Sequence, residues 1–417
     1  MKPAHSPAVR LAVLAEGQPA KVPYVQRSSG SEPRKRERVG LFDTTPFLLF
    51  WEMTRACDLA CQHCRASAVP TRSSLELDTD AGKRLLDDAH AMGVPLVVLT
   101  GGDPAKRPDL LELVRHGSSI GLRMALTPSA TPLITRELLE QLRDAGLSRL
   151  AISLDAASAS VHDAFRGTSG SHARTLEILR EARAIGLTTQ VNMSVVSENV
   201  GELPEVTELV RDLDVELFSI FFVVPTGRAR SGNALSALEV EVVLEWLAEK
   251  SDSFRFDVKT TAAPHFRRVL LQHKVRRQEI VGIRDGIGRA PRGVNDGSGV
   301  VFVSHEGDIF PSGFLPIHCG NVREEGLAQT YRHHPLFMAL RDGDQLGGKC
   351  GHCEFRFICG GSRARAFAEL GDALGADPGC LYEPSLEREE RVTLPDGGAL
   401  AGLPCASEGT ASKDASQ

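Results

Sequence analysis

Residues 51–67 read WEMTRACDLACQHCRAS and carry Cys57, Cys61 and Cys64 in the spacing C-x3-C-x2-C. These cysteines come directly after a predicted apolar strand, so we expect them on one loop at the end of that strand. One loop can place three thiolates on three corners of an iron–sulfur cubane, and the fourth iron then has no protein ligand. The alternatives are a structural zinc loop, for which His63 would be the fourth ligand, or three incidental cysteines.

Short apolar segments alternate with helical patterns around and after this loop. Each segment is nearly continuous in apolar residues, which is typical of parallel strands covered by helices. One helix is predicted after the N-cap Asp78 and before Gly93, and another between Thr135 and Gly146. The predicted strands cover residues 48–54, 96–101, 123–127, 150–155, 189–195 and 217–224.

Six successive βα units predict an α/β fold, either a parallel barrel or an open doubly wound sheet. In both architectures the functional side chains collect at the C-terminal ends of the strands. From about residue 300 the pattern changes to a predicted hairpin around 304–308 and a group of cysteines. The predicted division is a disordered leader (1–42), a barrel (43–258), a bridge (259–299), a small cysteine-dependent domain (300–393) and a disordered tail (394–417).

The second group of cysteines consists of Cys350, Cys353 and Cys359 in the spacing C-x2-C-x5-C, with Cys380 21 residues later. Four thiolates are enough to close a [4Fe-4S] cluster, and they fit a zinc site equally well. The chain has nine cysteines, and in a reducing compartment these are better interpreted as metal ligands or buried thiols than as disulfides.

The overall composition limits the class of protein. Of the 417 residues, 42% are hydrophobic and 24% are charged, as in ordinary globular proteins. A net charge of −6 argues against general nucleic-acid binding, which needs a basic face. No apolar stretch reaches about 18 residues, so we expect no membrane span. The first thirty residues lack an apolar signal core, which predicts a cytoplasmic location.

The segment 51–67 resembles the signature of the radical S-adenosylmethionine (SAM) superfamily, and the resemblance covers about residues 43–385. The chain is similar to members with a C-terminal SPASM or twitch domain, including haem-maturing radical SAM proteins. The resemblance implies a partial (β/α)6 barrel, similar to a TIM barrel, and an oxidoreductase. It implies that SAM binds the open iron of a [4Fe-4S] cluster on Cys57, Cys61 and Cys64. One-electron reduction, from a low-potential donor such as flavodoxin or ferredoxin, then yields a 5′-deoxyadenosyl radical.

The resemblance also implies which residues contact SAM. The segment Thr100–Pro104 is similar to a GGEP-like family motif, with Asp in place of Glu; from the residues alone, an ordinary βα turn is the alternative. Arg166 is similar to an arginine near the SAM carboxylate, and a surface ion pair is its alternative. The implied contacts are Gly101, Gly102, Asp103 and Pro104 after the second strand, Ser153 and Asp155 after the fourth, Arg166 beyond them, and Asn192 on the fifth strand.

In the SPASM pattern, Cys350, Cys353, Cys359 and Cys380 are similar to the ligands of an auxiliary [4Fe-4S] cluster. A full SPASM domain holds two auxiliary clusters, but Arg363 stands where a further cysteine is expected, and Ser312 follows Pro311 in place of another. The resemblance therefore implies a single auxiliary cluster, with Cys319 as a lone thiol.

The sequence says less about the substrate. Basic residues such as Lys259, Arg267, Arg268, Arg289 and Arg292 could hold the carboxylates of a tetrapyrrole or an acidic peptide, or could belong to a solvated helix. The favoured substrate is a tetrapyrrole propionate side chain, and the alternative is a peptide that the enzyme matures. A third hypothesis, an electron-transfer or zinc scaffold without enzymatic activity, leaves the barrel without a purpose.

Overall fold

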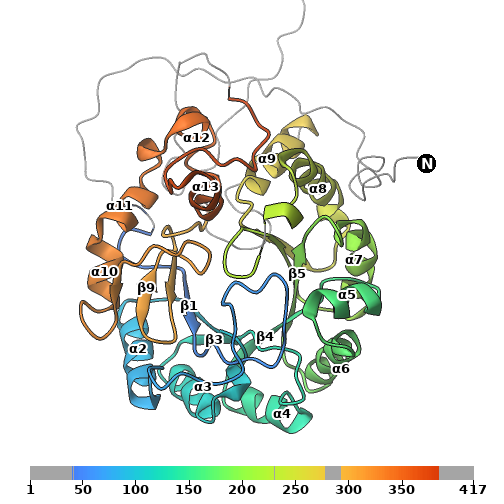
Figure 1. Ribbon diagram of the computed structural model, residues 1–417, viewed down its shortest axis with the longest axis vertical. Coiled ribbons are helices and arrows are strands. Elements are labelled where there is room, and N and C mark those ends of the chain that lie inside the picture. Colours follow the sequence, from blue (N-terminus) through green and yellow to red (C-terminus); the bar gives the residue numbers. More distant parts are fainter. Residues whose placement is uncertain (1–39, 41, 230, 278–292, 385–417) are drawn as a thin grey trace, which may run out of the picture.

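The computed structural model describes residues 40, 42–229, 231–277 and 293–384. Ten strands form one sheet in the order β10-β9-β8-β1-β2-β3-β4-β5-β6-β7, and helices cover its outer side (Figure 1). The strands are β1 (Leu48–Glu52), β2 (Leu96–Thr100), β3 (Arg123–Leu126), β4 (Leu147–Ser153), β5 (Thr189–Val195), β6 (Leu217–Phe222), β7 (Asp257–Thr261), β8 (Val300–Val303), β9 (Asp308–Phe310) and β10 (Gly320–Asn321).

Strands β1 to β7 are parallel neighbours in chain order, as in a partial barrel, which confirms the predicted α/β class. All six predicted strands are present, and their ends differ from the predicted ends by at most three residues. The seventh strand, β7, was not predicted, and it crosses residue 258, where we expected the barrel to end. Its sequence DVKTT has no apolar run that would reveal a strand.

Helices connect the strands and form the outer layer. As predicted, the side chain of Asp78 caps α2 by accepting from Ala81 N, and Thr135 caps α4 by accepting from Leu138 N. The helices are α2 (Thr79–Ala91), α3 (Leu110–Ser119), α4 (Arg136–Asp144), α5 (Ala159–Arg166), α6 (Ser171–Ala184), α7 (Leu203–Asp212), α8 (Ala237–Lys250), α9 (Phe266–Arg276), α10 (Leu327–His333), α11 (Pro335–Arg341), α12 (Gly348–His352) and α13 (Arg363–Leu370). Short 3-10 turns are η1 (Pro104–Lys106), η2 (Val200–Glu202), η3 (Ser231–Asn233), η4 (Ser251–Ser253) and η5 (Gly343–Gln345).

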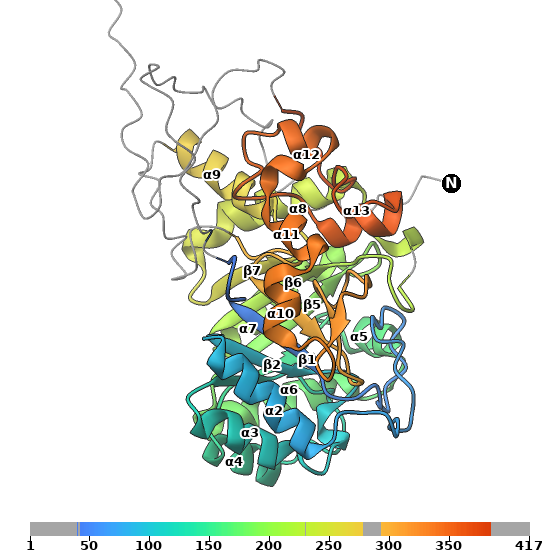
Figure 2. The same cartoon turned by 90° about the vertical axis from the view of Figure 1, so that its left-hand side faces the viewer.

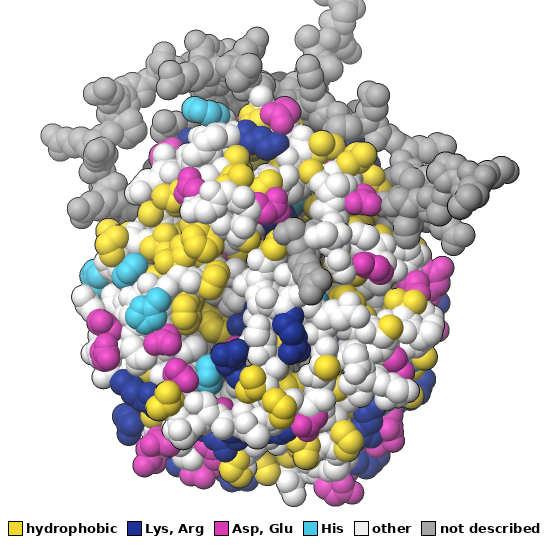
Figure 3. Space-filling model, in the orientation of Figure 1, with side chains coloured by type: hydrophobic (Ala, Val, Ile, Leu, Met, Phe, Trp, Pro, Cys, Tyr) yellow, Lys and Arg dark blue, Asp and Glu magenta, His cyan; other side chains and the backbone are white. Residues whose placement is uncertain are grey.

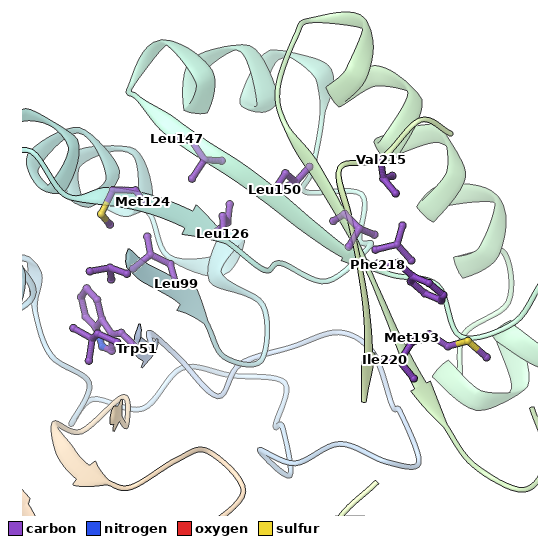
Figure 4. Packing of buried hydrophobic residues seen from close by; sticks show 14 of the residues in the cluster. Trp51, Leu99, Met124, Leu126, Leu147, Leu150, Met193, Val215, Phe218 and Ile220 are labelled. Atoms are coloured by element: carbon purple, nitrogen blue, oxygen red, sulfur yellow. The ribbon is translucent and has the colours of Figure 1, made fainter. Parts of the chain in front are cut away.

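The main hydrophobic core lies between the sheet and these helices (Figure 4). Trp51 of β1 is fully buried there, and a Cβ atom at Gly82 of α2 would lie 2.5 Å from its ring. Side chains along a strand alternate between faces, so the neighbour of Trp51, Glu52, points into the barrel. By the same alternation Asn192 of β5 and Ser219 of β6, which are partners in register, face the interior. The barrel interior is therefore partly polar.

The C-terminal part of the chain joins the same sheet. The predicted hairpin is present: β8 and β9 are antiparallel partners, and β8 is also a parallel partner of β1, with Leu48 opposite Val300. Figures 1 and 2 both show α12 and α13 beside α8 and α9. The sheet thus continues across the predicted boundary at residue 300. A second, small hydrophobic cluster contains Val224, Leu315, Leu340, Ala364 and Ala373.

Most of the predicted leader (1–42) and all of the predicted tail (394–417) lie outside the described residues, as does Cys405. Among the residues that the structure describes, no helix is long and apolar enough to cross a membrane.

Candidate functional site

The loop that carries the first three cysteines follows β1 and crosses the mouth of the barrel (blue in Figure 1). Its backbone is tied to the ends of several strands. Asp103 N, after β2, donates to Ala56 O at 2.7 Å, and Arg228 N, after β6, donates to Cys64 O at 3.0 Å. Gln62 N donates to Phe165 O of α5 at 3.3 Å. The shape of the loop is therefore set by the barrel itself.

Two glycines allow this close approach of backbones. A Cβ atom at Gly102 would lie 2.4 Å from Ala56 O. Gly227 has φ +62°, and a Cβ atom there would lie 2.2 Å from Arg65 O. Only glycine fits both positions without moving the cysteine loop. Arg228, next to Gly227, adds a side-chain contact, because its Nε donates to Cys61 O at 3.0 Å.

The three thiols are neighbours in a partly cationic environment. Burial raises the pKa of Cys57, and the Cys61 thiol adds to this, while Ser129 Oγ at 3.2 Å from Cys57 Sγ opposes it. Burial also raises the pKa of Cys61; Arg166 opposes this, with Nη1 3.8 Å from the sulfur, and Cys64 adds to it. Buried thiolates need such compensating charge, and Arg166, the last residue of α5, provides it at Cys61.

The predicted GGDP motif lies directly beneath this loop. Gly102 N donates to Thr54 O at 2.7 Å, and Asp103 N donates to Ala56 O, so both amides hold the cysteine loop. The Asp103 carboxylate is fully buried and accepts from Thr131 Oγ1 at 2.7 Å and from Ala105 N at 3.1 Å. Burial raises its pKa. The Asp103 carboxylate therefore stabilises the turn after β2 through hydrogen bonds within the protein. Gly101 has φ +149°, and Pro104 begins η1.

Asp155 and Arg166 form a buried ion pair beside Cys61. Arg166 Nε lies 2.6 Å from Asp155 Oδ2, and Ser194 N donates to the other oxygen at 2.8 Å. Burial alone would raise the pKa of Asp155, but the Arg166 guanidinium outweighs it, and the pKa is lowered. Arg166 thus links the β4 end to a cysteine sulfur. Ser153 and Asn192 are partners in register on β4 and β5.

The sequence did not predict a buried network that connects the cysteine loop to the C-terminal hairpin. Glu52 accepts from Arg65 Nη2 at 2.6 Å, and its other oxygen lies 3.0 Å from His305 Nδ1. Burial would raise the pKa of Glu52, but Arg65 and His305 outweigh it, and the pKa is lowered. Arg65 also lies over the Phe302 ring of β8, 4.6 Å from the ring centroid. The charged Glu52 at the end of an apolar strand was the one signal available.

Figure 3 shows the outer surface of this region. Lys and Arg side chains lie near the centre of the face, over the cysteine loop, and hydrophobic side chains gather beside them, toward α11 and β9. This combination suits a ligand that is both anionic and apolar.

The second cysteine group is also brought together. Burial raises the pKa of Cys359 well above its ordinary value, and the nearby thiols of Cys380, Cys353 and Cys350 add to the rise. Cys350 Sγ accepts from Asp377 N at 3.4 Å and lies 3.7 Å from Arg363 Nη2. The four thiols that the spacing suggested therefore lie near enough to affect the pKa of Cys359, although they span residues 350–380.

Other candidate ligands have different roles. His63 stacks on Phe165, with ring centroids 4.0 Å apart, and burial lowers its pKa to about 3. Cys319 belongs to the main core, where burial raises its pKa to about 12. Within the described ranges, no group of three or more His, Cys, Asp or Glu side chains is arranged to hold a metal ion. Arg289 and Arg292 lie outside the described residues.

Known proteins share both the sequence and the fold. A family model described as "Radical SAM superfamily" matches residues 51–210. An "AdoMet-dependent heme synthase" of Methanosarcina barkeri is 37% identical over 340 residues, which cover 81% of this chain and 97% of that protein. The chain belongs to the radical SAM superfamily. A "PqqA peptide cyclase" of Rhodopseudomonas palustris is 32% identical over 355 residues, covering 82% of this chain and 89% of that protein.

The fold of this radical SAM enzyme also occurs in solved structures. Streptococcus suis SuiB bound to its precursor peptide SuiA matches with a TM-score of 0.62 at 17% identity, covering 82% of this chain and 76% of SuiB. The likeness confirms the partial barrel.

Radical SAM enzymes use a [4Fe-4S] cluster and SAM, and the mouth of this barrel fits such a group. One loop offers three thiols there. Two buried nitrogens at the loop, His63 Nδ1 and Arg228 Nη2, have no hydrogen-bond partner among the described residues. Buried polar atoms without partners are rare in proteins, so this region has unused capacity to bind a polar cofactor.

Proposed function

We propose that this radical SAM enzyme oxidatively decarboxylates propionate side chains of an iron-bound tetrapyrrole, and so forms vinyl groups. The 37% identity to an "AdoMet-dependent heme synthase", which extends over 97% of that protein, carries the proposal. The 32% identity to a "PqqA peptide cyclase" makes peptide maturation the competing hypothesis.

In this proposal Cys57, Cys61 and Cys64 hold the [4Fe-4S] cluster, and SAM binds its open iron. When bound, the two supply a 5′-deoxyadenosyl radical that abstracts a hydrogen atom. A low-potential flavodoxin or ferredoxin in the cytoplasm supplies the electron. The proposed SAM contacts are Gly101, Gly102, Asp103, Pro104, Ser153, Asp155, Arg166 and Asn192; for Asp103 the contact would come from the backbone, because its carboxylate is committed to Thr131 and Ala105.

The chemistry needs an electron acceptor. A propionate that loses one hydrogen atom becomes a carbon radical; it then releases CO2, forms a vinyl group and gives up one electron. We propose that the four thiols of Cys350, Cys353, Cys359 and Cys380 hold an auxiliary [4Fe-4S] cluster within a SPASM or twitch domain, and that this cluster receives the electron. Four thiolates leave it no open iron, so direct substrate coordination is not part of the proposal.

The barrel interior suits a polycarboxylate. Ser219 Oγ is buried and has no hydrogen-bond partner among the described residues. It lies in register between Asn192 of β5 and Lys259 of β7, so these polar groups share the interior face. With Asn192 assigned to SAM, the Ser219 hydroxyl and the Lys259 ammonium beside it can bind a propionate while the hydrophobic surroundings contact the macrocycle.

The test is anaerobic reconstitution with iron and sulfide, followed by SAM, dithionite and an iron porphyrin that bears propionates. We expect about eight irons per chain, as two cubanes, and 5′-deoxyadenosine together with a porphyrin that has lost CO2 and two hydrogens per propionate. Iron near four with stoichiometric zinc would contradict the auxiliary cluster. 5′-Deoxyadenosine without any porphyrin product, but with a modified precursor peptide, would favour the competing hypothesis.

A further inference from the structure

Arg363 is a buried guanidinium in the second cysteine site. It is the first residue of α13 and is 1% exposed. Its Nε donates to Gly361 O at 3.1 Å, and its Nη1 donates to Gly375 O at 2.6 Å and to Ala373 O at 3.3 Å. The remaining nitrogen, Nη2, points at Cys350 Sγ, 3.7 Å away. The carbonyl contacts of Nε and Nη1 thus fix the planar guanidinium so that Nη2 faces a candidate cluster ligand.

The other buried arginines near this site are neutralised by carboxylates. Arg268 makes a two-pronged pair with Glu241 at 2.8 and 2.6 Å. Arg365 lies 3.1 Å from Asp377. For Arg363, three of the contacts are carbonyl oxygens, and no carboxylate of the described residues forms an ion pair with it. Among these contacts of Arg363, only the Cys350 sulfur would carry negative charge, as a thiolate ligand of a cluster.

We infer that Arg363 is a positioning residue that raises the reduction potential of the auxiliary cluster. The inference rests on the proposed auxiliary [4Fe-4S] cluster. A cubane with four thiolates is anionic, and accepting the electron from the substrate radical adds one more negative charge. A buried cation and a hydrogen bond to a ligand sulfur both favour the reduced form, because net charge and hydrogen bonds to sulfur set cluster potentials.

The position of this residue strengthens the argument. Position 363 is where the resemblance led us to expect a further cysteine, and a guanidinium there replaces a ligand anion with a cation. Gly361 makes room for it, since a Cβ atom at Gly361 would lie 2.5 Å from Arg363 Nη2 and 3.0 Å from Cys350 Sγ. A side chain at position 361 would therefore displace the guanidinium or the Cys350 sulfur.

The test is a redox titration, followed by electron paramagnetic resonance, of the full chain in which Cys57, Cys61 and Cys64 are replaced by Ala, so that only the auxiliary cluster gives a signal. In this background Arg363→Gln keeps a hydrogen-bond donor and loses the charge, whereas Arg363→Lys keeps the charge. Arg356→Gln is the matched control, because Arg356 lies in the same unit but is paired with Asp344 at 2.9 Å.

We expect Arg363→Gln to shift the equilibrium about tenfold toward the oxidised cluster, which is about 59 mV for one electron. Arg363→Lys should recover most of the shift, and Arg356→Gln should leave the potential unchanged. An unchanged potential in Arg363→Gln with its cluster bound would overturn the inference and leave the proposed function standing. A second site that holds zinc and no iron would overturn both.

A second measurement covers the case in which Arg363→Gln loses its cluster. In protein labelled with ¹⁵N-arginine, pulsed resonance on the reduced cluster should detect a nitrogen coupling that disappears in Arg363→Lys. If the arginine-labelled parent shows no such coupling, the guanidinium does not contact the cluster, and the inference fails.

Discussion

The two cysteine sites bring their buried thiols together in different ways. The first takes three cysteines from one loop, residues 57–64, and ties its backbone to strand ends and to α5. The second takes four cysteines from residues 350–380, where the helices α12 and α13 have 5 and 8 residues. The first site is shaped by the barrel core, whereas the second has only a small hydrophobic cluster beside it. We therefore predict that the fold does not depend on a metal group at the first site, and that the C-terminal residues around the second site do depend on one.

The largest expected effect tests the first half of this comparison. Replacing Cys57, Cys61 and Cys64 together by Ala should abolish 5′-deoxyadenosine formation. The free energy of unfolding should fall by less than about 2 kcal/mol, because the strand ends still hold the loop. An assay of SAM cleavage and a thermal melt measure both. Persistent cleavage would refute the ligand assignment. An unfolded barrel would refute the prediction that the fold does not depend on a metal group at the first site.

The second half is tested by Cys380→Ala. Loss of one of four thiolates should remove the auxiliary cluster and reduce porphyrin product formation by more than about 100-fold, which exceeds the usual effect of changing a residue that only hydrogen-bonds to a metal ligand. Uncoupled 5′-deoxyadenosine formation should continue, because the barrel site is intact. Iron analysis and both assays are compared with Cys319→Ala, which removes a core thiol. Normal product from protein shown to lack the cluster would rule out an electron relay.

The consequence for the C-terminal unit is measured separately. If a metal group stabilises the fold around the second site, Cys380→Ala should make residues 343–384 sensitive to protease while the barrel sheet, β8 included, stays protected, because metal binding and folding are coupled. Equal protection of both parts would show that the two sites do not differ in this respect.

A smaller effect is expected from Arg166→Ala. Apparent affinity for SAM should fall about tenfold with little change in the chemical step, since a carboxylate partner acts in ground and transition states alike. Arg166→Lys, which keeps the charge, is the control. A change in KM for SAM that is larger than the change in kcat would show that Arg166 acts on SAM binding. An unchanged KM for SAM would contradict the contact.

The stability of Arg166→Ala should also depend on pH. In the native chain the pKa of Asp155 is lowered from 3.8, so the pair stabilises the fold above that pH and the contribution fades as pH falls through the folded pKa. Without Arg166, burial dominates and raises the pKa of Asp155. The destabilisation, about 3–5 kcal/mol near neutral pH for a broken buried pair, should then shrink as the pH is lowered and the carboxylate takes up a proton.

The smallest effect concerns the link between the two regions. Glu52→Gln keeps the shape of the side chain but removes the charge that Arg65 and His305 share, and we expect a loss of about 1–3 kcal/mol. Chemical denaturation measures it, with Lys83→Gln on the helix surface as a neutral control. If Glu52→Gln is as stable as the native chain, the network does not connect the cysteine loop to the hairpin energetically.

Much of the barrel could be predicted because its strands are apolar and short, and because caps such as Asp78 and Thr135 mark the helices. Strand β7 could not, since its apolar content is too low. The role of the Asp103 carboxylate depends on its hydrogen bond from Thr131. These two residues are 28 positions apart, so no local pattern predicts the contact. The Glu52–His305 contact joins positions 253 residues apart, and no local pattern reports such a distance. Local signals reveal elements, whereas contacts between distant elements complete the site.

The pairing of β8 with β1 can form only late in the synthesis of the chain. Leu48 lies opposite Val300, so one edge of β1 has no partner until 252 further residues have been made. At about 5–20 residues per second, this takes roughly 13–50 s. Throughout that interval Phe302 and His305, which hold Arg65 and Glu52 in the finished protein, do not yet exist. The cysteine loop is therefore open on its β8 side until the ribosome has made β8 and His305.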